Sequence, residues 1–173
     1  MMKYLLSMGH REIGIIGGRA DNIHTQKRLL GIQKAMFEEQ VPYNPGWVRY
    51  GAWDRESGYE QAGPLVDAGV SAIFCMADRM AGGVYDYLEE HGLRAGEDIS
   101  ITGFDNQDLS EYIRPALTTM SLPLSEIGHK AAEMLLERIG GEEKEAEAAD
   151  EKAAEIKIPC SIVLRNSVKR NQP

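Results

Sequence analysis

Side chains that can bond a small polar molecule stand directly after short apolar runs of this sequence. The runs, which read as buried strands, are residues 13–16, 47–50, 72–76 and 99–102. The turns after the last three hold these candidate residues: Trp53, Ala77, Asp78, Asp105 and Asn106. Ligands of open parallel sheets bind outside the carboxyl ends of the strands. The pattern therefore indicates non-covalent binding in a cleft at the strand ends.

Catalytic and cofactor-binding patterns are missing from the sequence. The glycines of Gly14-x-x-Gly17-Gly18 follow a strand, but their spacing differs from G-x-G-x-x-G and favours a tight turn over a dinucleotide site. There is no G-x-x-x-x-G-K-[ST] and no G-x-S-x-G. The four histidines are scattered without metal-ligand spacing. We therefore expect no enzyme activity, no cofactor and no metal.

Strand-like runs alternate with longer helical patterns, which predicts a parallel sheet covered on both faces. The predicted helices span 26–39, 58–68 and 125–139, and a further helix is predicted to follow Asp78 and to run to about residue 90. Ser57 to Glu60 has the form of a capping box, and Asp78 stands where an N-cap is expected. Late strand candidates are 156–159 and 161–164.

Composition excludes several classes of protein. The 173 residues are 43% hydrophobic and carry a formal net charge of −8, which argues against this chain gripping nucleic acid by itself. No apolar run approaches the roughly 20 residues that cross a bilayer, and the start is too polar for a signal peptide. Cys75 and Cys160 sit in apolar surroundings, so we expect two buried thiols in a reducing cytoplasm instead of a disulfide.

A series of segments resembles, in order, the lactose/galactose-repressor (LacI/GalR) family of bacterial transcription regulators. YLLSMGHREIGIIGG at 4–18 is similar to the family segment LLxxGHRxIxxIGG, and AIFCMADRMA at 72–81 to AIFCxNDxMA. GLRAGEDISITGFDN at 92–106 is similar to GLRVPEDISVVGFDD. Shorter matches are RLLGI at 28–32, SGY at 57–59, PALTT at 115–119 and the closing LPxxLxxRxS at 158–167.

The resemblance implies a periplasmic-binding-protein-like α/β fold that begins near the second lobe of an effector-binding domain. We then expect the second lobe over 1–119, a return segment of the first lobe over 120–139, an acidic mobile loop over 140–155, and C-terminal strands and tail over 156–173. The helix-turn-helix with which family members begin does not occur in this sequence. DNA would be contacted only through that missing N-terminal element.

The resemblance also implies residue roles. Arg28 matches the family arginine that reaches the effector, and Asp105 matches the acid after the family's GF. Trp53 matches an aromatic residue that flanks a sugar ring. Ala77 departs from the usual Asn, which points to a less common effector. Asp78 and Asn106 complete the expected cleft.

We therefore expect the ligand-sensing portion of a DNA-binding regulator. It would bind a small polar effector, a sugar or sugar derivative, and control DNA affinity allosterically as a cytoplasmic homodimer without membrane contact. The alternative is a periplasmic solute-binding protein of a transporter, which shares the fold.

Overall fold

The computed structural model describes residues 1–140 and 155–171. They form two compact units, Met1–Ser121 with Ile162–Pro173, and Leu122–Ser161. The predicted acidic loop at 140–155 lies, apart from its two end residues, outside the described residues and stays a prediction.

A four-stranded parallel sheet organises the larger unit, which confirms the predicted fold class. Its strands lie in the order β2-β1-β3-β4 and are, along the chain, β1 (Ile13–Gly17), β2 (Val48–Tyr50), β3 (Ala72–Cys75) and β4 (Ser100–Thr102). Each neighbouring pair is parallel. Each strand differs from its predicted bounds by one residue at one end.

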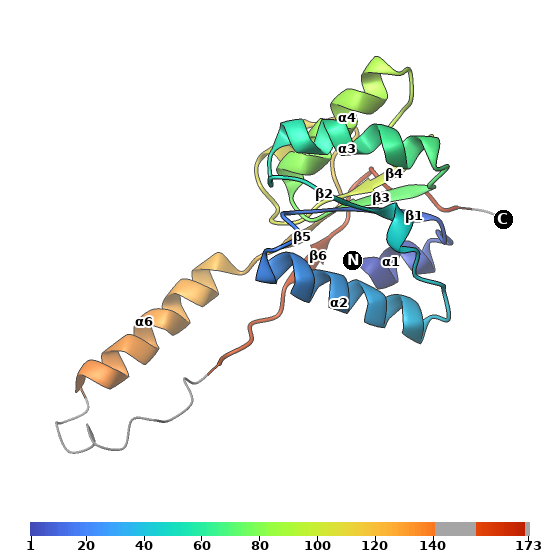
Figure 1. Cartoon of the computed structure of the whole chain (residues 1–173). Helices are drawn as coiled ribbons and strands as arrows, with labels where there is room; N and C mark the ends of the chain where they lie inside the picture. Colours follow the sequence, from blue (N-terminus) through green and yellow to red (C-terminus); the bar gives the residue numbers. More distant parts are fainter. Residues whose placement is uncertain (141–154, 172–173) are drawn as a thin grey trace. The chain divides into compact units, whose positions relative to one another are not determined.

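Helices cover both faces of this sheet. Helices α1 (Met2–Ser7) and α2 (Ile23–Glu38) lie on one face, and α3 (Arg55–Asp67) and α4 (Asp78–Glu90) lie on the other (Figure 1). Successive strand side chains point to opposite faces, so Phe74 packs with the α1–α2 core while Ile73 and Cys75 pack with the α3–α4 core. Two buried faces explain why the strands read as continuous apolar runs.

The remaining elements of the described residues are three short segments of three or four residues in the larger unit, one short strand after them and one long helix. They are the 3₁₀ turn η1 (Pro45–Trp47), α5 (Leu109–Tyr112), and the strands β5 (Thr119–Ser121) and β6 (Ser161–Val163), which pair with each other. Helix α6 (Leu124–Gly140) belongs to the smaller unit. Of the two late strand candidates, 161–164 corresponds to β6, which ends one residue earlier, whereas 156–159 has no regular secondary structure.

Helix α2 begins at Ile23, three residues earlier than predicted, and two expectations about helix caps are wrong. Helix α3 begins at Arg55, because the Asp54 carboxylate accepts a 2.9 Å hydrogen bond from the Ser57 amide and caps the helix three residues earlier than predicted. Helix α4 is capped by position 77, and Asp78 is its first residue. The expectation of two buried thiols holds only for Cys75, since Cys160 lies in the irregular stretch before β6 and is exposed.

Candidate functional site

Arg28 lies where three strand ends of the sheet meet. It stands on the second turn of α2, and its Nη1 donates a 2.5 Å hydrogen bond to the carbonyl of Met76, which follows β3. Its guanidinium carbon is 3.8 Å from the centroid of the Phe104 ring and 5.5 Å from that of Trp53. Aromatic faces attract a guanidinium held over them, so these contacts fix the arginine head group between two rings.

Trp53 follows β2 and has a left-handed backbone, with φ of 68°. Its indole ring packs over Gly18, which follows β1. A Cβ atom on residue 18 would lie 1.8 Å from a ring carbon, so only glycine leaves room for the ring. The glycine turn predicted from the sequence therefore provides the space in which the Trp53 ring packs.

Asp105 and Asn106 follow β4 in a turn with unusual backbone angles. Their φ values are 106° and 56°. Within the described residues, the left-handed non-glycine residues are Gln40, Trp53, Asp105 and Asn106, so three of the four are predicted site residues. Such backbone strain persists where surrounding contacts enforce it, and it gathers at ligand sites.

The electrostatic environment links Asp105 with Arg28. Partial burial raises the pKa of the Asp105 carboxyl above its ordinary value, while the nearby Arg28 charge opposes that shift. An arginine donor and a carboxylate acceptor thus lie within electrostatic reach of each other at the strand ends, and the arginine contacts two aromatic rings.

The other expected cleft residues are Ala77, Asp78 and Asn106, which are buried or hydrogen-bonded within the larger unit. Ala77 is buried and offers a methyl group. Asp78 is fully buried, and its carboxylate accepts hydrogen bonds from the Thr119 hydroxyl at 2.6 Å and the Gln107 amide at 2.7 Å. Burial raises the pKa of Asp78 to about 6, although both hydrogen bonds oppose the shift. The Asn106 side-chain oxygen accepts a 2.9 Å hydrogen bond from Arg165.

Three further residues belong to this neighbourhood and are not among the site residues predicted from the sequence. Phe104, Thr119 and Arg165 each touch a predicted site residue. Phe104 precedes Asp105 directly and could have been chosen from the strand-end rule. Thr119 and Arg165 lie in the PALTT and closing segments, whose patterns gave no indication of these long-range contacts.

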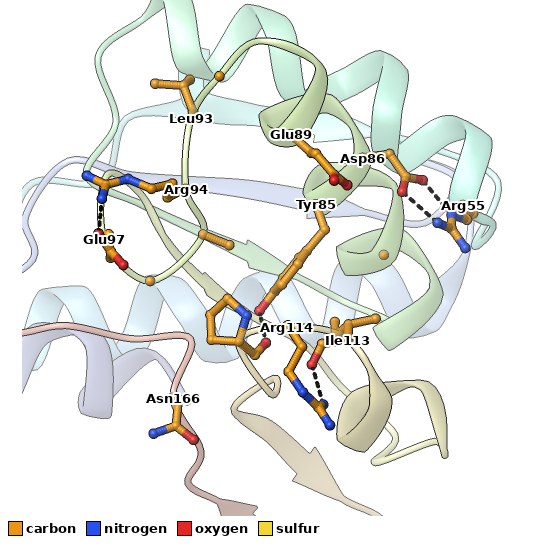
Figure 2. Close-up of a pocket in the computed structure, with 15 residues that line it drawn as sticks. Arg55, Tyr85, Asp86, Glu89, Leu93, Arg94, Glu97, Ile113, Arg114 and Asn166 are labelled. Atoms are coloured by element: carbon orange, nitrogen blue, oxygen red, sulfur yellow. Dashed lines mark hydrogen bonds and ion pairs between the residues drawn. The ribbon is translucent and has the colours of Figure 1, made fainter.

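A cavity of about 850 Å³ lies away from this neighbourhood, beside α4 and the 92–97 loop. Figure 2 shows two ion pairs among the residues that line it, Arg55 with Asp86 and Arg94 with Glu97. The Tyr85 hydroxyl donates to the carbonyl of Pro115. Two of the three arginines that line this cavity already have acidic partners, and none of the predicted site residues lines it, so the strand-end cluster is the better candidate site.

Comparison with known proteins shows that this chain is similar to part of several bacterial regulators. A family model described as a periplasmic binding protein-like domain matches residues 2–168. The repressor PurR of Pasteurella multocida is 39% identical over 169 residues, covering 96% of this chain and 48% of the repressor. PurR of Vibrio parahaemolyticus is 33% identical, covering 97% and 49%. The chain therefore spans about half the length of the curated relatives it matches.

Solved structures of the same class superpose closely. A LacI-family regulator from Enterococcus faecium with bound ribose has a TM-score of 0.85 at 31% identity, covering 99% of this chain and 61% of the other. The lac repressor dimer bound to operator and the anti-inducer ONPF has a TM-score of 0.82 at 28% identity, covering 96% and 56%.

The comparisons also address the class of protein. The relatives are transcriptional repressors and not enzymes, as the sequence analysis expects for this chain. No helix among the described residues is long and apolar enough to cross a membrane. The chain belongs to the periplasmic binding protein-like domain family, in the form that LacI/GalR-type transcriptional regulators use for effector binding.

Proposed function

We propose that this chain senses a small polar effector, a sugar or sugar derivative, at the carboxyl edge of its parallel sheet. The main support is the position of Arg28, which is held between the rings of Trp53 and Phe104 within the field of Asp105. A guanidinium can bond two neighbouring hydroxyls, a carboxylate accepts from others, and an indole face packs against the apolar face of a sugar. The ribose-bound relative supports the same ligand class.

In the whole regulator, effector binding would change DNA affinity. A ligand shifts an equilibrium only by binding one state more tightly than the other. In this proposal residues 1–119 correspond to the second lobe and 120–139 to a return segment of the first. The other lobe closes over the ligand, and a preceding helix-turn-helix reads DNA in a cytoplasmic homodimer. The dimeric lac repressor supports the homodimer. The helix-turn-helix type of the relatives favours this function over a periplasmic solute-binding protein.

Calorimetry with a panel of sugars and phosphorylated sugars tests the proposal. Asp105→Asn removes the ionised acceptor and should weaken binding by roughly 10- to 100-fold, the usual cost of losing a charged hydrogen bond. Asp67→Asn is a matched control, because Asp67 is exposed at the end of α3. Equal losses for both variants, or unchanged affinity in Asp105→Asn, would refute the assignment.

Comparing this chain with the full-length protein tests whether the other lobe, which closes over the ligand in this proposal, contributes to binding. Small-molecule sites bury about 70–90% of their ligand, and one lobe alone leaves the effector partly in water. We therefore expect weak binding by this chain and tight binding by the full-length protein. Equal, tight affinity would show that this lobe suffices.

A further inference from the structure

Arg165, two residues past the end of β6, bonds three residues that lie much earlier in the larger unit. Its side chain is 14% exposed. Its Nη1 donates a 2.8 Å hydrogen bond to the Leu117 carbonyl, and its Nη2 donates to Asn106 at 2.9 Å and to Glu111 at 3.1 Å. These acceptors lie 48 to 59 residues earlier in the chain. The guanidinium is therefore a cross-link between the C-terminal segment and the turn that holds Asp105.

That turn depends on contacts at three points. Its first residue, Asp105, donates its amide to the Met120 carbonyl at 2.9 Å, and its third, Gln107, donates its amide to Asp78 at 2.7 Å. Between them, the Asn106 side chain accepts from Arg165 at 2.9 Å and, more weakly, from Ser110 at 3.4 Å. Both Asp105 and Asn106 have positive φ, which L residues rarely adopt without such support.

We propose that Arg165 is a positioning residue for the effector site: it holds Asn106, and so keeps Asp105 in the left-handed turn that presents its carboxylate beside Arg28. The inference rests on the proposed function, in which Asp105 bonds the effector. Arg165 itself does not contact the ligand. The role requires arginine because a planar fork can reach a carbonyl, an amide oxygen and a carboxylate together, whereas a lysine ammonium cannot match that geometry.

The first test needs no ligand. NMR couplings that report φ at Asp105 and Asn106 are measured in the native chain and in Arg165→Met, which keeps an unbranched apolar stem. We expect the native couplings to correspond to left-handed φ and those of the variant to average over other conformations. Asn106→Ala, which removes the acceptor but keeps the arginine, should show the same change at Asp105. Unchanged couplings in both variants would overturn the proposal.

A control and a rescue separate positioning from general support of the fold. Arg114→Met is the control, because Arg114 is exposed and donates to the carbonyls of Glu111 and Ile113 in its own segment. Adding Asn106→Gly to Arg165→Met should restore the native φ at Asp105, since glycine adopts positive φ without steric cost. Rescue distinguishes a conformational role from lost packing, which glycine cannot repair. Failure of the rescue would count against the proposal.

Affinity gives the second readout, with D-ribose as the first probe and the sugar panel after it. Arg165→Met should weaken binding about tenfold, and the added Asn106→Gly should recover most of that loss. If the native protein binds no member of the panel, the proposed ligand class fails while the couplings still decide the role of Arg165. Tight binding by a variant whose turn has lost positive φ would overturn the positioning role alone.

Discussion

The Thr119 hydroxyl donates a 2.6 Å hydrogen bond to the Asp78 carboxylate, although the two residues are 41 positions apart. Both side chains are fully buried. Asp78 opens α4, and Thr119 opens β5, so this contact fixes the start of a sheet-covering helix to the strand that leads toward the smaller unit. The second carboxylate oxygen holds the amide of Gln107, beside the candidate ligand turn.

Stability should depend on pH through Asp78. Burial raises its folded pKa to about 6, above the unfolded value of 3.8, so the folded state binds this proton more tightly. Its contribution to the free energy of unfolding is therefore greatest below pH 3.8 and falls as pH rises toward 6, by up to about 3 kcal/mol at 1.36 kcal/mol per pKa unit. Other carboxyls also titrate, so the measurement is the difference between native and Asp78→Asn in urea unfolding at several pH values.

Two further variants sharpen that experiment. Thr119→Val removes a donor that lowers the Asp78 pKa, so the pH window of the difference should move upward. Asp67 is exposed, so Asp67→Asn serves as the control and should leave the pH dependence of the free energy of unfolding as it is in the native chain. A native-minus-Asp78→Asn difference that is flat between pH 4 and 6 would contradict the assignment.

Gly83→Ala should destabilise the larger unit through the contact between α3 and α4. A Cβ atom at position 83 would lie 1.9 Å from the Arg55 carbonyl oxygen and 2.5 Å from the Tyr59 amide nitrogen. Backbone atoms cannot rotate away, so we expect a loss at the upper end of the roughly 1–3 kcal/mol typical of overpacking. Gly31→Ala, in open space on α2, should instead stabilise by about 0.5–1 kcal/mol. Thermal unfolding of the two variants gives the comparison.

Gly18→Ala should displace the Trp53 ring and leave the sheet intact. The added methyl group would overlap ring atoms at 1.8 to 2.3 Å, and the ring is the movable partner. In a Trp47→Phe background, Trp53 is the remaining tryptophan. Its fluorescence emission should shift, and the contact between its ring and Arg28 should weaken. Because Gly18 is buried and Trp53 packs against both core clusters, we expect the free energy of unfolding to fall by about 1–3 kcal/mol, as is typical of overpacking. Emission identical to that of the background protein would argue against the described ring position.

Helix α6 should promote self-association of this chain. Leu135 and Ile139 are 59% and 70% exposed, and Leu124 and Leu136 are exposed as well. Contiguous apolar surface of this kind usually marks an interaction site. Sedimentation velocity should show concentration-dependent association that the double change Leu135→Glu and Ile139→Glu abolishes. Glu137→Gln, on the same helix, should leave association intact, and a strictly monomeric native chain would contradict the expectation.

The sequence by itself determined the parallel sheet and the region of the candidate site. Apolar runs separated by helical patterns required strands buried on both faces, and parallel strands bring their carboxyl ends to one edge. Arg28 and Trp53 are accordingly in contact, and Asp105 lies within the field of Arg28. Local patterns suffice here because strand direction and chain order decide where the loops gather.

Only the tertiary structure decided which polar groups bond one another. Asp78 was predicted as a helix cap because capping rules consider only residues close in the sequence. In the structure its carboxylate instead accepts hydrogen bonds from Thr119 and Gln107, which lie later in the chain. Within the described residues, no side-chain hydrogen bond caps the start of α4. Arg165 gave no local signal because its acceptors lie at least 48 residues away. A buried polar group needs a hydrogen-bond partner, and the fold can supply that partner from any part of the chain. Local sequence patterns therefore do not indicate which residue it will be.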